Sequence, residues 1–152
     1  MLLRRGLQAI QALLELALDP PAWRSVSDLA EAQGLPAPML EQLLLRLRRA
    51  DLLEARRGRR GGYRLARAPR EIALAQVLRA VEALPEATVP GAAAVAGAAG
   101  GDAATRQVTA LLESRLQRAL ERELAQLTLE ELLFDLRSAR AAQGSHGGLI
   151  LG

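Results

Sequence analysis

The apolar residues of the chain recur at three- and four-residue steps over much of its length, which is the spacing of one face of an α-helix. In the first such stretch, Leu7, Ile10, Leu13 and Leu14 belong to the apolar face, and Pro20 follows where a helix cannot continue. The spacing predicts helices over residues 3–18, 39–50, 74–84, 103–126 and 129–141, and the sequence also favours a short helix between Ser25 or Ser27 and Gly34. We therefore expect a mainly α-helical fold.

Two of the expected helices stand close together, and the sequence marks their boundaries. Ser25 or Ser27 is a suitable N-cap for the first, and Gly34 is a suitable stop because glycine accepts a left-handed backbone. The second opens on Pro36 and Pro38, since proline is tolerated in the first turn of a helix. Two helices joined by a short turn that contains glycine make the pattern of a helix-turn-helix.

A β-hairpin is expected directly after this helix pair. Residues 52–56 and 63–66 are typical of short strands, and residues 57–62 join them. The glycines of this loop permit a positive φ, and its tip holds Arg57, Arg59 and Arg60. The sequence therefore predicts a winged helix-turn-helix, mainly α with a small β-hairpin wing. A plain glycine-rich turn is the alternative interpretation of the loop.

The second half of the chain has a different character. Residues 85–102 are rich in alanine, glycine and proline, which predicts a flexible loop. The helix over residues 103–126 carries a stripe that its own half of the chain is too small to cover, so we expect it to cross a second copy. The expected dimer contact consists of Val108, Leu112, Leu116, Leu120 and Leu124. Thr128 and Glu131 are spaced as a capping box for the last helix.

These patterns divide the chain into four parts. We expect a winged helix-turn-helix domain over residues 1–84, a flexible loop over residues 85–102, dimerisation helices over residues 103–141 and a disordered tail over residues 142–152.

Positive charge is concentrated in one segment. The chain has 152 residues and a net charge of +3, and all 20 of its basic residues are arginine. Residues 46–70 contain 10 arginines and only two acidic residues, Asp51 and Glu54. A surplus of this density is the electrostatic footprint of a protein that meets phosphate. A solvated basic face is the alternative interpretation of the same charges.

The remaining composition removes several classes of chemistry. The chain has no cysteine, which excludes disulfides, thiol catalysis and clusters held by cysteine. Its only histidine is His146, and no acidic pair has catalytic spacing, so we expect neither an enzyme nor a metal or cofactor. No membrane span or signal peptide is expected either. These observations favour a cytoplasmic protein, associated with the nucleoid if it binds DNA.

Residues 2–133 resemble a family of bacterial regulators. The resemblance is carried by Leu40-Glu-Gln42, Leu47-Arg48, Leu52, Arg57-Gly58, Gly61-Gly-Tyr63 and Leu65-Ala66. They are similar to the run that marks winged-helix transcription regulators of the IscR, NsrR and CymR type, the Rrf2 family. The resemblance implies a homodimer whose long helices cross, with two wings on a pseudo-palindromic operator in double-stranded DNA.

The resemblance also implies roles for individual residues. Glu41 and Gln42 would lie near base edges, where glutamate accepts from cytosine and glutamine reads adenine. Arg57 would enter the minor groove, and Arg59 and Arg60 would add phosphate contacts. The full set of expected DNA-contacting residues is Ser27, Pro38, Met39, Glu41, Gln42, Arg46, Arg57, Gly58, Arg59, Arg60 and Tyr63.

Two departures from the family pattern change these expectations. The family usually begins the recognition helix with hydroxyl-bearing residues that contact DNA, whereas this chain has Pro36-Ala-Pro-Met39. We therefore expect a different operator or affinity. Many members also hold an iron–sulfur cluster through three cysteines in the loop that corresponds to residues 85–105, and this chain has no ligand set there. We therefore expect a regulator without a cluster.

Two hypotheses for the function follow. The first is a sequence-specific DNA-binding transcriptional regulator that acts as a homodimer. The second is a protein-interaction module that keeps the fold with weak or lost operator recognition; the Pro-Ala-Pro-Met segment favours it and the wing arginines oppose it. A small ligand between the winged domain and the long helix, or a protein partner, is left open.

Overall fold

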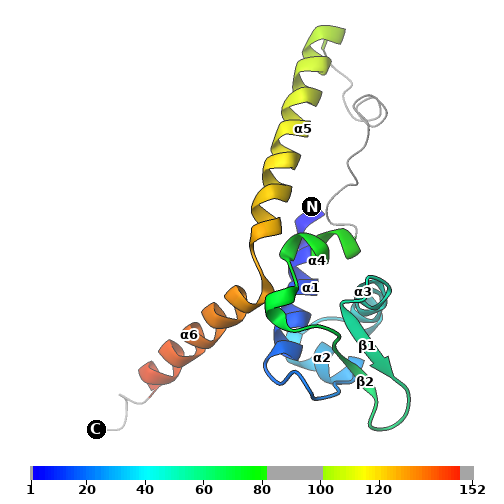
Figure 1. The fold of residues 1–152 in the computed structure, drawn as a ribbon, viewed down its shortest axis with the longest axis vertical. Helices are drawn as coiled ribbons and strands as arrows, with labels where there is room; N and C mark the ends of the chain where they lie inside the picture. Colours follow the sequence, from blue (N-terminus) through cyan, green and yellow to red (C-terminus); the bar gives the residue numbers. More distant parts are fainter. Residues whose placement is uncertain (1, 82–100, 148–152) are drawn as a thin grey trace.

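The computed structural model describes residues 2–81 and 101–147, whose arrangement is shown in Figure 1. The described elements are α1 (Leu2–Ala17), α2 (Val26–Gln33), α3 (Ala37–Arg49), β1 (Leu53–Arg56), β2 (Gly62–Leu65), a short 3₁₀ helix η1 (Pro69–Glu71), α4 (Leu74–Ala80), α5 (Ala103–Gln126) and α6 (Leu129–Gly147). The expected helices and hairpin are present in the expected order. The prediction of a mainly α fold with a small β-hairpin wing is therefore confirmed.

The core lies among α1 to α4, the hairpin and the first turns of α6, and leucine dominates it. Its largest fully buried side chains are Leu13, Leu16, Leu29, Leu40, Leu44, Leu47, Leu52, Ile72, Val77, Val81 and Leu129. Each helix contributes one apolar face, which is why the three- and four-residue spacing is visible in the sequence. Leu7 is the exception on α1: it is exposed, although Gly6 and Ala9 of the same helix are buried.

The helix-turn-helix forms through the predicted local signals. Of the two serines considered, Ser25 is the N-cap of α2, and its Oγ accepts a hydrogen bond from the backbone nitrogen of Asp28 at 3.1 Å. Gly34 ends α2 in the left-handed conformation, with φ 62°. Pro36 precedes α3, and Pro38 lies in its first turn, where the missing N–H has no intrahelical partner.

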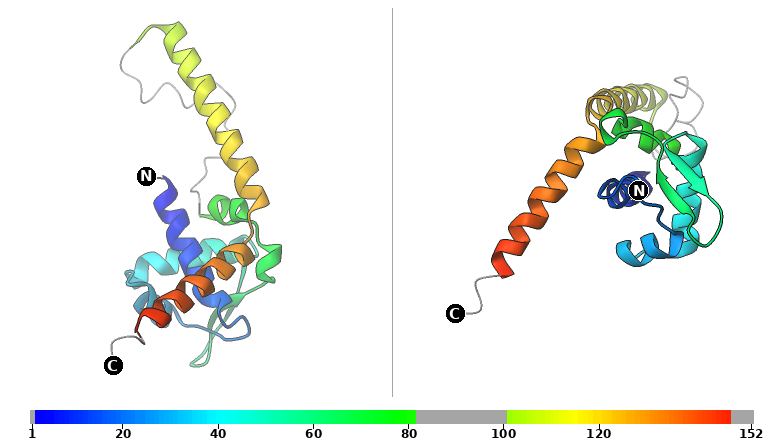
Figure 2. Two further views of the ribbon diagram at one scale, coloured as in Figure 1. Left: turned by 90° about the vertical axis from the view of Figure 1, so that its left-hand side faces the viewer. Right: turned by 60° about the horizontal axis from the view of Figure 1, so that its bottom comes forward.

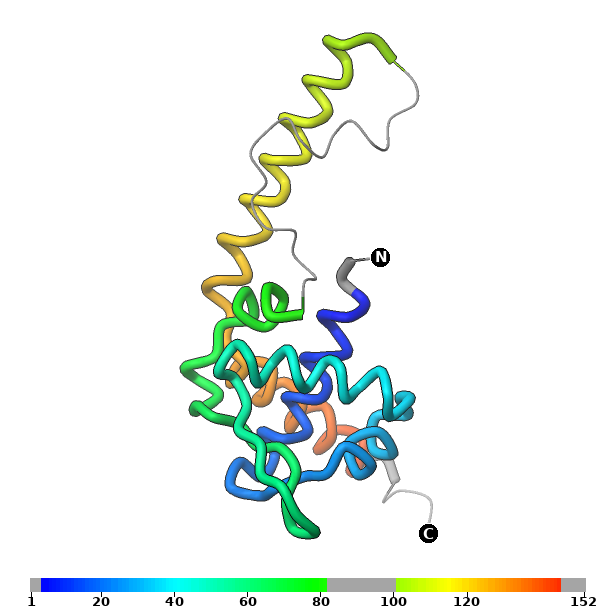
Figure 3. Tube along the Cα trace, turned by 90° about the vertical axis from the view of Figure 1, so that its right-hand side faces the viewer, coloured from blue at the N-terminus to red at the C-terminus, as the bar shows by residue number. Residues whose placement is uncertain are grey.

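The hairpin is attached to the helix-turn-helix along both of its edges. β1 packs against α3 and pairs with β2 in an antiparallel register that joins Leu53 to Leu65. On the other edge, Arg24 and Tyr63 exchange two backbone hydrogen bonds, of 2.9 and 2.8 Å. Gly62 permits this approach, because a Cβ at its position would lie 2.2 Å from the carbonyl oxygen of Arg24. The tip of the wing extends beyond both attachments (Figures 1 and 3).

α5 projects from the core, with its C-terminal end at the core and its N-terminal end furthest from it, and α6 continues from that junction past α1, with which it is in contact (Figures 1 and 2). The predicted capping box forms at the start of α6: the Thr128 nitrogen donates to Glu131 Oε2 at 3.1 Å, and the Glu131 nitrogen donates to Thr128 Oγ1 at 3.4 Å. The junction between the two helices is also joined to the start of α4. The nitrogen of Leu74 donates to the carbonyl oxygen of Leu127, and the nitrogen of Leu129 donates to that of Ile72, both at 2.9 Å.

Two helix ends differ from the sequence prediction. α4 ends at Ala80 rather than at residue 84. α6 runs to Gly147, although the sequence predicts a disordered tail from residue 142; no proline interrupts this stretch, and the Ser145 hydroxyl donates to the carbonyl oxygen of Ala141 at 3.2 Å. The predicted flexible loop over residues 85–102, apart from its last two residues, and the last five residues of the chain lie outside the described residues.

Candidate nucleic-acid interface

The exposed side of α3 presents the residues predicted to read bases. Leu40 is fully buried, whereas Glu41 and Gln42, which follow it, are exposed. Pro38 is exposed and Met39 is half-buried. The buried leucines of α3 fix the rotation of the helix on the core, so this rotation leaves the glutamate and glutamine side chains available to a ligand.

Three other predicted contact residues lie in different surroundings. Ser27 is exposed on α2. Arg46 is half-buried and donates from Nη1 to the carbonyl oxygen of Val81 at 3.3 Å, which links α3 to the end of α4. The side chain of Tyr63 packs against the hydrophobic core. Arg46 and Tyr63 therefore have partners inside the fold, which separates them from the exposed residues of α3.

The tip of the wing carries a group of unpaired positive charges. Arg57, Arg59 and Arg60 are all exposed, and within residues 2–81 and 101–147 no hydrogen bond or ion pair involves their guanidinium groups. Gly58 has a φ of 108°, and the Gly61 nitrogen donates to the Gly58 carbonyl oxygen at 3.1 Å, so the turn is closed by its own backbone. Among the described residues, none forms an ion pair with these three cations of the turn.

The arginines of the two strands are used differently, which their spacing in the sequence did not predict. The guanidinium carbons of Arg56 and Arg64 lie 4.6 and 4.3 Å from the centre of the Trp23 ring. Arg64 also pairs with Glu54 at 2.8 Å. The signal that could have found this group is a tryptophan in the turn after two prolines, opposite strand positions 54, 56 and 64, which share one face of the hairpin.

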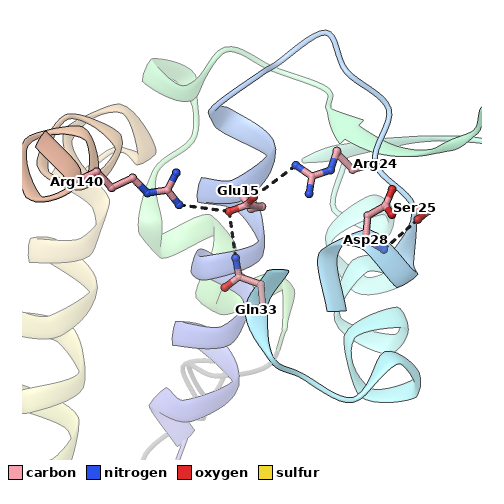
Figure 4. A network of polar contacts seen from close by, with 6 residues as sticks. All are labelled: Glu15, Arg24, Ser25, Asp28, Gln33 and Arg140. Carbon is pink, nitrogen blue, oxygen red and sulfur yellow. Dashed lines mark hydrogen bonds and ion pairs between the residues drawn. The ribbon is translucent and has the colours of Figure 1, made fainter. Parts of the chain in front are cut away.

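A second group that sequence reasoning missed centres on Glu15, whose side chain is 16% exposed. Figure 4 shows three partners around its carboxylate: Arg24 at 3.5 Å, Gln33 at 3.4 Å and Arg140 at 3.7 Å. These contacts connect α1 with the segment before α2, the end of α2, and α6. The available signal was that Glu15 is the only acidic residue of α1, within a run of leucines.

The predicted dimer stripe lies on the outside of α5. Val108, Leu112, Leu116 and Leu120 are 65%, 54%, 62% and 38% exposed, and Leu124 packs partly against the core.

At the start of α5, the N-cap is Asp102, which accepts hydrogen bonds from the hydroxyl and the backbone nitrogen of Thr105. These two bonds hold the pKa of Asp102 below its usual range.

An open groove of about 910 Å³ lies between α4 and α5. Its lining includes Arg79 from α4 and Arg115, Arg118 and Arg122 from α5, with Leu116 among them. The groove lies between the winged domain and the long helix, which is the place where the sequence left the binding of a small ligand as an open possibility. It also shares Leu116 with the exposed stripe of α5, so the two features overlap.

The described residues offer no metal site and no membrane span. None of their His, Cys, Asp and Glu side chains form a group of three or more that could hold a metal ion. None of the described helices is both long and apolar enough to cross a membrane.

The chain is similar to known transcriptional regulators along most of its length. Residues 2–135 match the Rrf2 family, described as an iron-dependent transcriptional regulator. The Synechocystis protein slr0846, whose name describes an HTH-type transcriptional regulator, is 42% identical over 141 residues, which are 90% of this chain and 89% of that protein. IscR of Cereibacter sphaeroides is 41% identical over 102 residues, which are 65% of this chain and 66% of that protein.

Solved structures give the same result. IscR of T. potens has a TM-score of 0.66 and 31% identity, with 90% of this chain and 88% of that chain covered. CymR of B. subtilis, titled the global cysteine regulator, has a TM-score of 0.63 and 28% identity, with 86% and 93% covered. The residues present here do not fit a cysteine-held iron–sulfur cluster, because the chain has no cysteine. The match over residues 2–135, together with the winged helix-turn-helix, shows that this chain belongs to the Rrf2 family of DNA-binding transcriptional regulators.

Proposed function

We propose that the protein regulates transcription in the cytoplasm by binding double-stranded operator DNA as a homodimer, without an iron–sulfur cluster. One observation carries this proposal most directly: the tip of a hairpin that packs beside α3 holds three exposed guanidinium groups, which have no partner in the part of the chain that the structure describes. Exposed cations without protein partners are suited to phosphate, and arginine in particular suits a narrow minor groove.

The two parts of the interface have different tasks. Glu41 and Gln42 on α3 carry the side-chain groups that distinguish bases, since a carboxylate accepts from cytosine and an amide pairs with adenine. Arg57, Arg59 and Arg60 bind the backbone and the minor groove, which fixes the register of α3 without reading sequence. Ser27 on α2, Pro38 and Met39 on α3, and Gly58 in the wing loop belong to the same proposed set of contacts.

The second copy is needed to cover α5. Val108, Leu112 and Leu116 are each more than half exposed in the single chain, and an apolar row of this kind on a helix that projects from the core suits an identical helix crossing it. A two-fold dimer carries two wings, and the matching operator has inverted-repeat symmetry.

The proposal is tested by retaining genomic DNA fragments on the purified, metal-free protein at two salt concentrations and sequencing them. Enrichment of a few sites with inverted-repeat symmetry is the expected result. Uniform retention that disappears with salt would contradict operator recognition and favour the protein-interaction alternative, because a basic surface alone gives sequence-independent, salt-sensitive binding.

Two variants divide the interface. Arg57→Ala with Arg59→Ala is expected to weaken binding to every sequence and to lower the salt slope by about 0.9 for each phosphate that is no longer neutralised. Arg118→Ala with Arg137→Ala removes the same charge from exposed helix positions outside the wing and serves as the matched control. Glu41→Gln is expected to change base preference while leaving the salt slope unchanged.

A further inference from the structure

The largest aromatic side chain of the protein is not part of its core. Trp23 is half-buried in the turn before α2 and does not belong to the residues that pack on the hydrophobic core. Its ring instead lies against Arg56 of β1 and Arg64 of β2, at 4.6 and 4.3 Å. A guanidinium at this distance from an indole ring is within the range of a cation–π contact. Trp23 therefore joins both strands of the wing to the helix-turn-helix.

The backbone beside Trp23 makes the same connection. Arg24 pairs with Tyr63 through two backbone hydrogen bonds, and Gly62 has no side chain in the space where the two segments meet. On its other side, Arg24 donates to Glu15 of α1 at 3.5 Å (Figure 4). The turn that holds Trp23 is thus anchored to α1 and to β2 at once.

One of the two arginines extends this connection to the tip of the wing. Arg56, with its guanidinium over the ring, donates from Nη2 to the carbonyl oxygen of Arg60 at 2.6 Å. Arg60 lies within the loop that carries the three exposed cations of the wing tip. A continuous set of contacts therefore runs from the Trp23 ring through Arg56 to the loop.

We propose that Trp23 is a positioning residue for DNA binding: its ring holds Arg56 and Arg64 and thereby fixes the direction of the wing tip, without contacting DNA itself. This inference rests on the proposed role of the wing. It assigns different tasks to the arginines of the hairpin, since the two strand arginines orient the loop and the tip arginines meet phosphate. Two exposed cation–π contacts of usual strength correspond to roughly five- to thirtyfold in an equilibrium constant, which is the largest loss of affinity that this role explains.

The test is a double-mutant cycle on the full-length protein, with binding to one duplex fragment of mixed sequence measured at low salt. The variants are Trp23→Ala, Arg57→Ala with Arg59→Ala, and all three together. Each dissociation constant is referred to the active fraction, found by stoichiometric titration, so that partial unfolding does not count as weak binding. We expect Trp23→Ala to weaken binding by up to about thirtyfold in the wild-type background and by less than about twofold when the tip arginines are absent.

Three results would overturn the inference. Equal losses in the two backgrounds mean that Trp23 acts independently of the tip. Unchanged affinity for Trp23→Ala, while the tip variant binds weakly, means that the wing needs no such support and leaves the proposed function intact. Unchanged affinity for the tip variant removes the wing assignment, and the inference with it.

Two further variants separate positioning from stability. Trp23→Phe keeps an aromatic face and is expected to retain most of the affinity; a loss equal to that of Trp23→Ala contradicts the ring contact. If Trp23→Ala does not fold, Arg56→Gln tests the same link, because it removes the guanidinium and keeps the tryptophan. A positioning role predicts that Arg56→Gln also has no effect when Arg57 and Arg59 are alanine, whereas a direct phosphate contact by Arg56 predicts additive losses.

Discussion

Replacing Leu116 by glutamate is expected to separate the two copies of the proposed homodimer while leaving α5 helical. Glutamate and leucine have similar helix propensities, so the substitution removes an apolar contact without breaking the helix. Leu116 is 62% exposed in the single chain, and complete burial of a leucine contributes about 1.5–3 kcal/mol. Covering the exposed part therefore contributes about 1–2 kcal/mol per protomer.

Symmetry doubles this effect, because each substitution occurs twice in a two-fold contact. We expect dimerisation to weaken by about 2–4 kcal/mol, which is roughly thirty- to several-hundredfold in the dissociation constant. Sedimentation equilibrium over a range of protein concentrations measures this constant, and circular dichroism confirms that the helical content is kept.

The matched control is Ala125→Glu. Ala125 is exposed and lies nine residues further along α5, about two and a half turns, so it is off the exposed apolar stripe, although it lines the groove beside α4 together with Leu116. It introduces the same charge and is expected to leave the dimer intact. The reasoning is refuted if Leu116→Glu and Ala125→Glu dimerise as tightly as the unmodified chain, or if the unmodified chain is monomeric at all concentrations.

Three further predictions concern stability and pH. Gly62→Ala is expected to lower the free energy of unfolding by at least about 1–3 kcal/mol, the usual cost of a φ of 137° for a residue with a side chain. Gly144→Ala, in an open helical position, is expected to raise it by about 0.5–1 kcal/mol. Thermal unfolding would contradict this prediction if both variants changed stability in the same direction. Glu15→Ala is expected to lower the free energy of unfolding by about 1–3 kcal/mol, because it leaves Gln33 and two arginines without their shared acceptor. A change below about 0.3 kcal/mol in urea unfolding would show that the contacts of Glu15 do not stabilise the fold. The pKa of Asp102 in the folded chain is lowered, chiefly by the hydrogen bond from the Thr105 hydroxyl. The stability that this N-cap contributes is therefore complete above the unfolded pKa and is lost as pH falls through the lower folded pKa. The amide chemical shift of Thr105, followed by NMR, should change in that acid range and should not change there in Asp102→Ala.

The sequence predicted the elements well because their signals are local. Proline, glycine and serine mark the ends of α2 and α3, and the Thr128–Glu131 box marks the start of α6. The end of α6 was predicted too early, because a glycine at position 144 suggests a stop that the surrounding helix overrides.

The candidate site could be predicted only in part, because the sequence does not show the tertiary contacts that some of its arginines make. Arginine content located the wing, but it did not separate the exposed tip from Arg56 and Arg64, which lie over Trp23. The sequence likewise did not show that Arg46, one of the expected DNA contacts, bonds to the carbonyl oxygen of Val81 at the end of α4. A guanidinium that is free to bind phosphate and one that holds a strand have the same letter in the sequence, and only the position of their neighbours distinguishes them.

The junction between α5 and α6 also bears on the distance between the two wings in the proposed dimer. Backbone hydrogen bonds join residues 127–129 to residues 72–74 on both sides, in the manner of an isolated β-bridge. The long helix therefore meets the proposed DNA-reading part at a fixed angle, and in the proposed homodimer this angle would relate the crossing of the two α5 helices to the distance between the two wings. DNA repeats its groove about every 34 Å. In a dimer built on this junction, a small change in the crossing of the two long helices alters the distance between the wings, while each wing keeps its own structure.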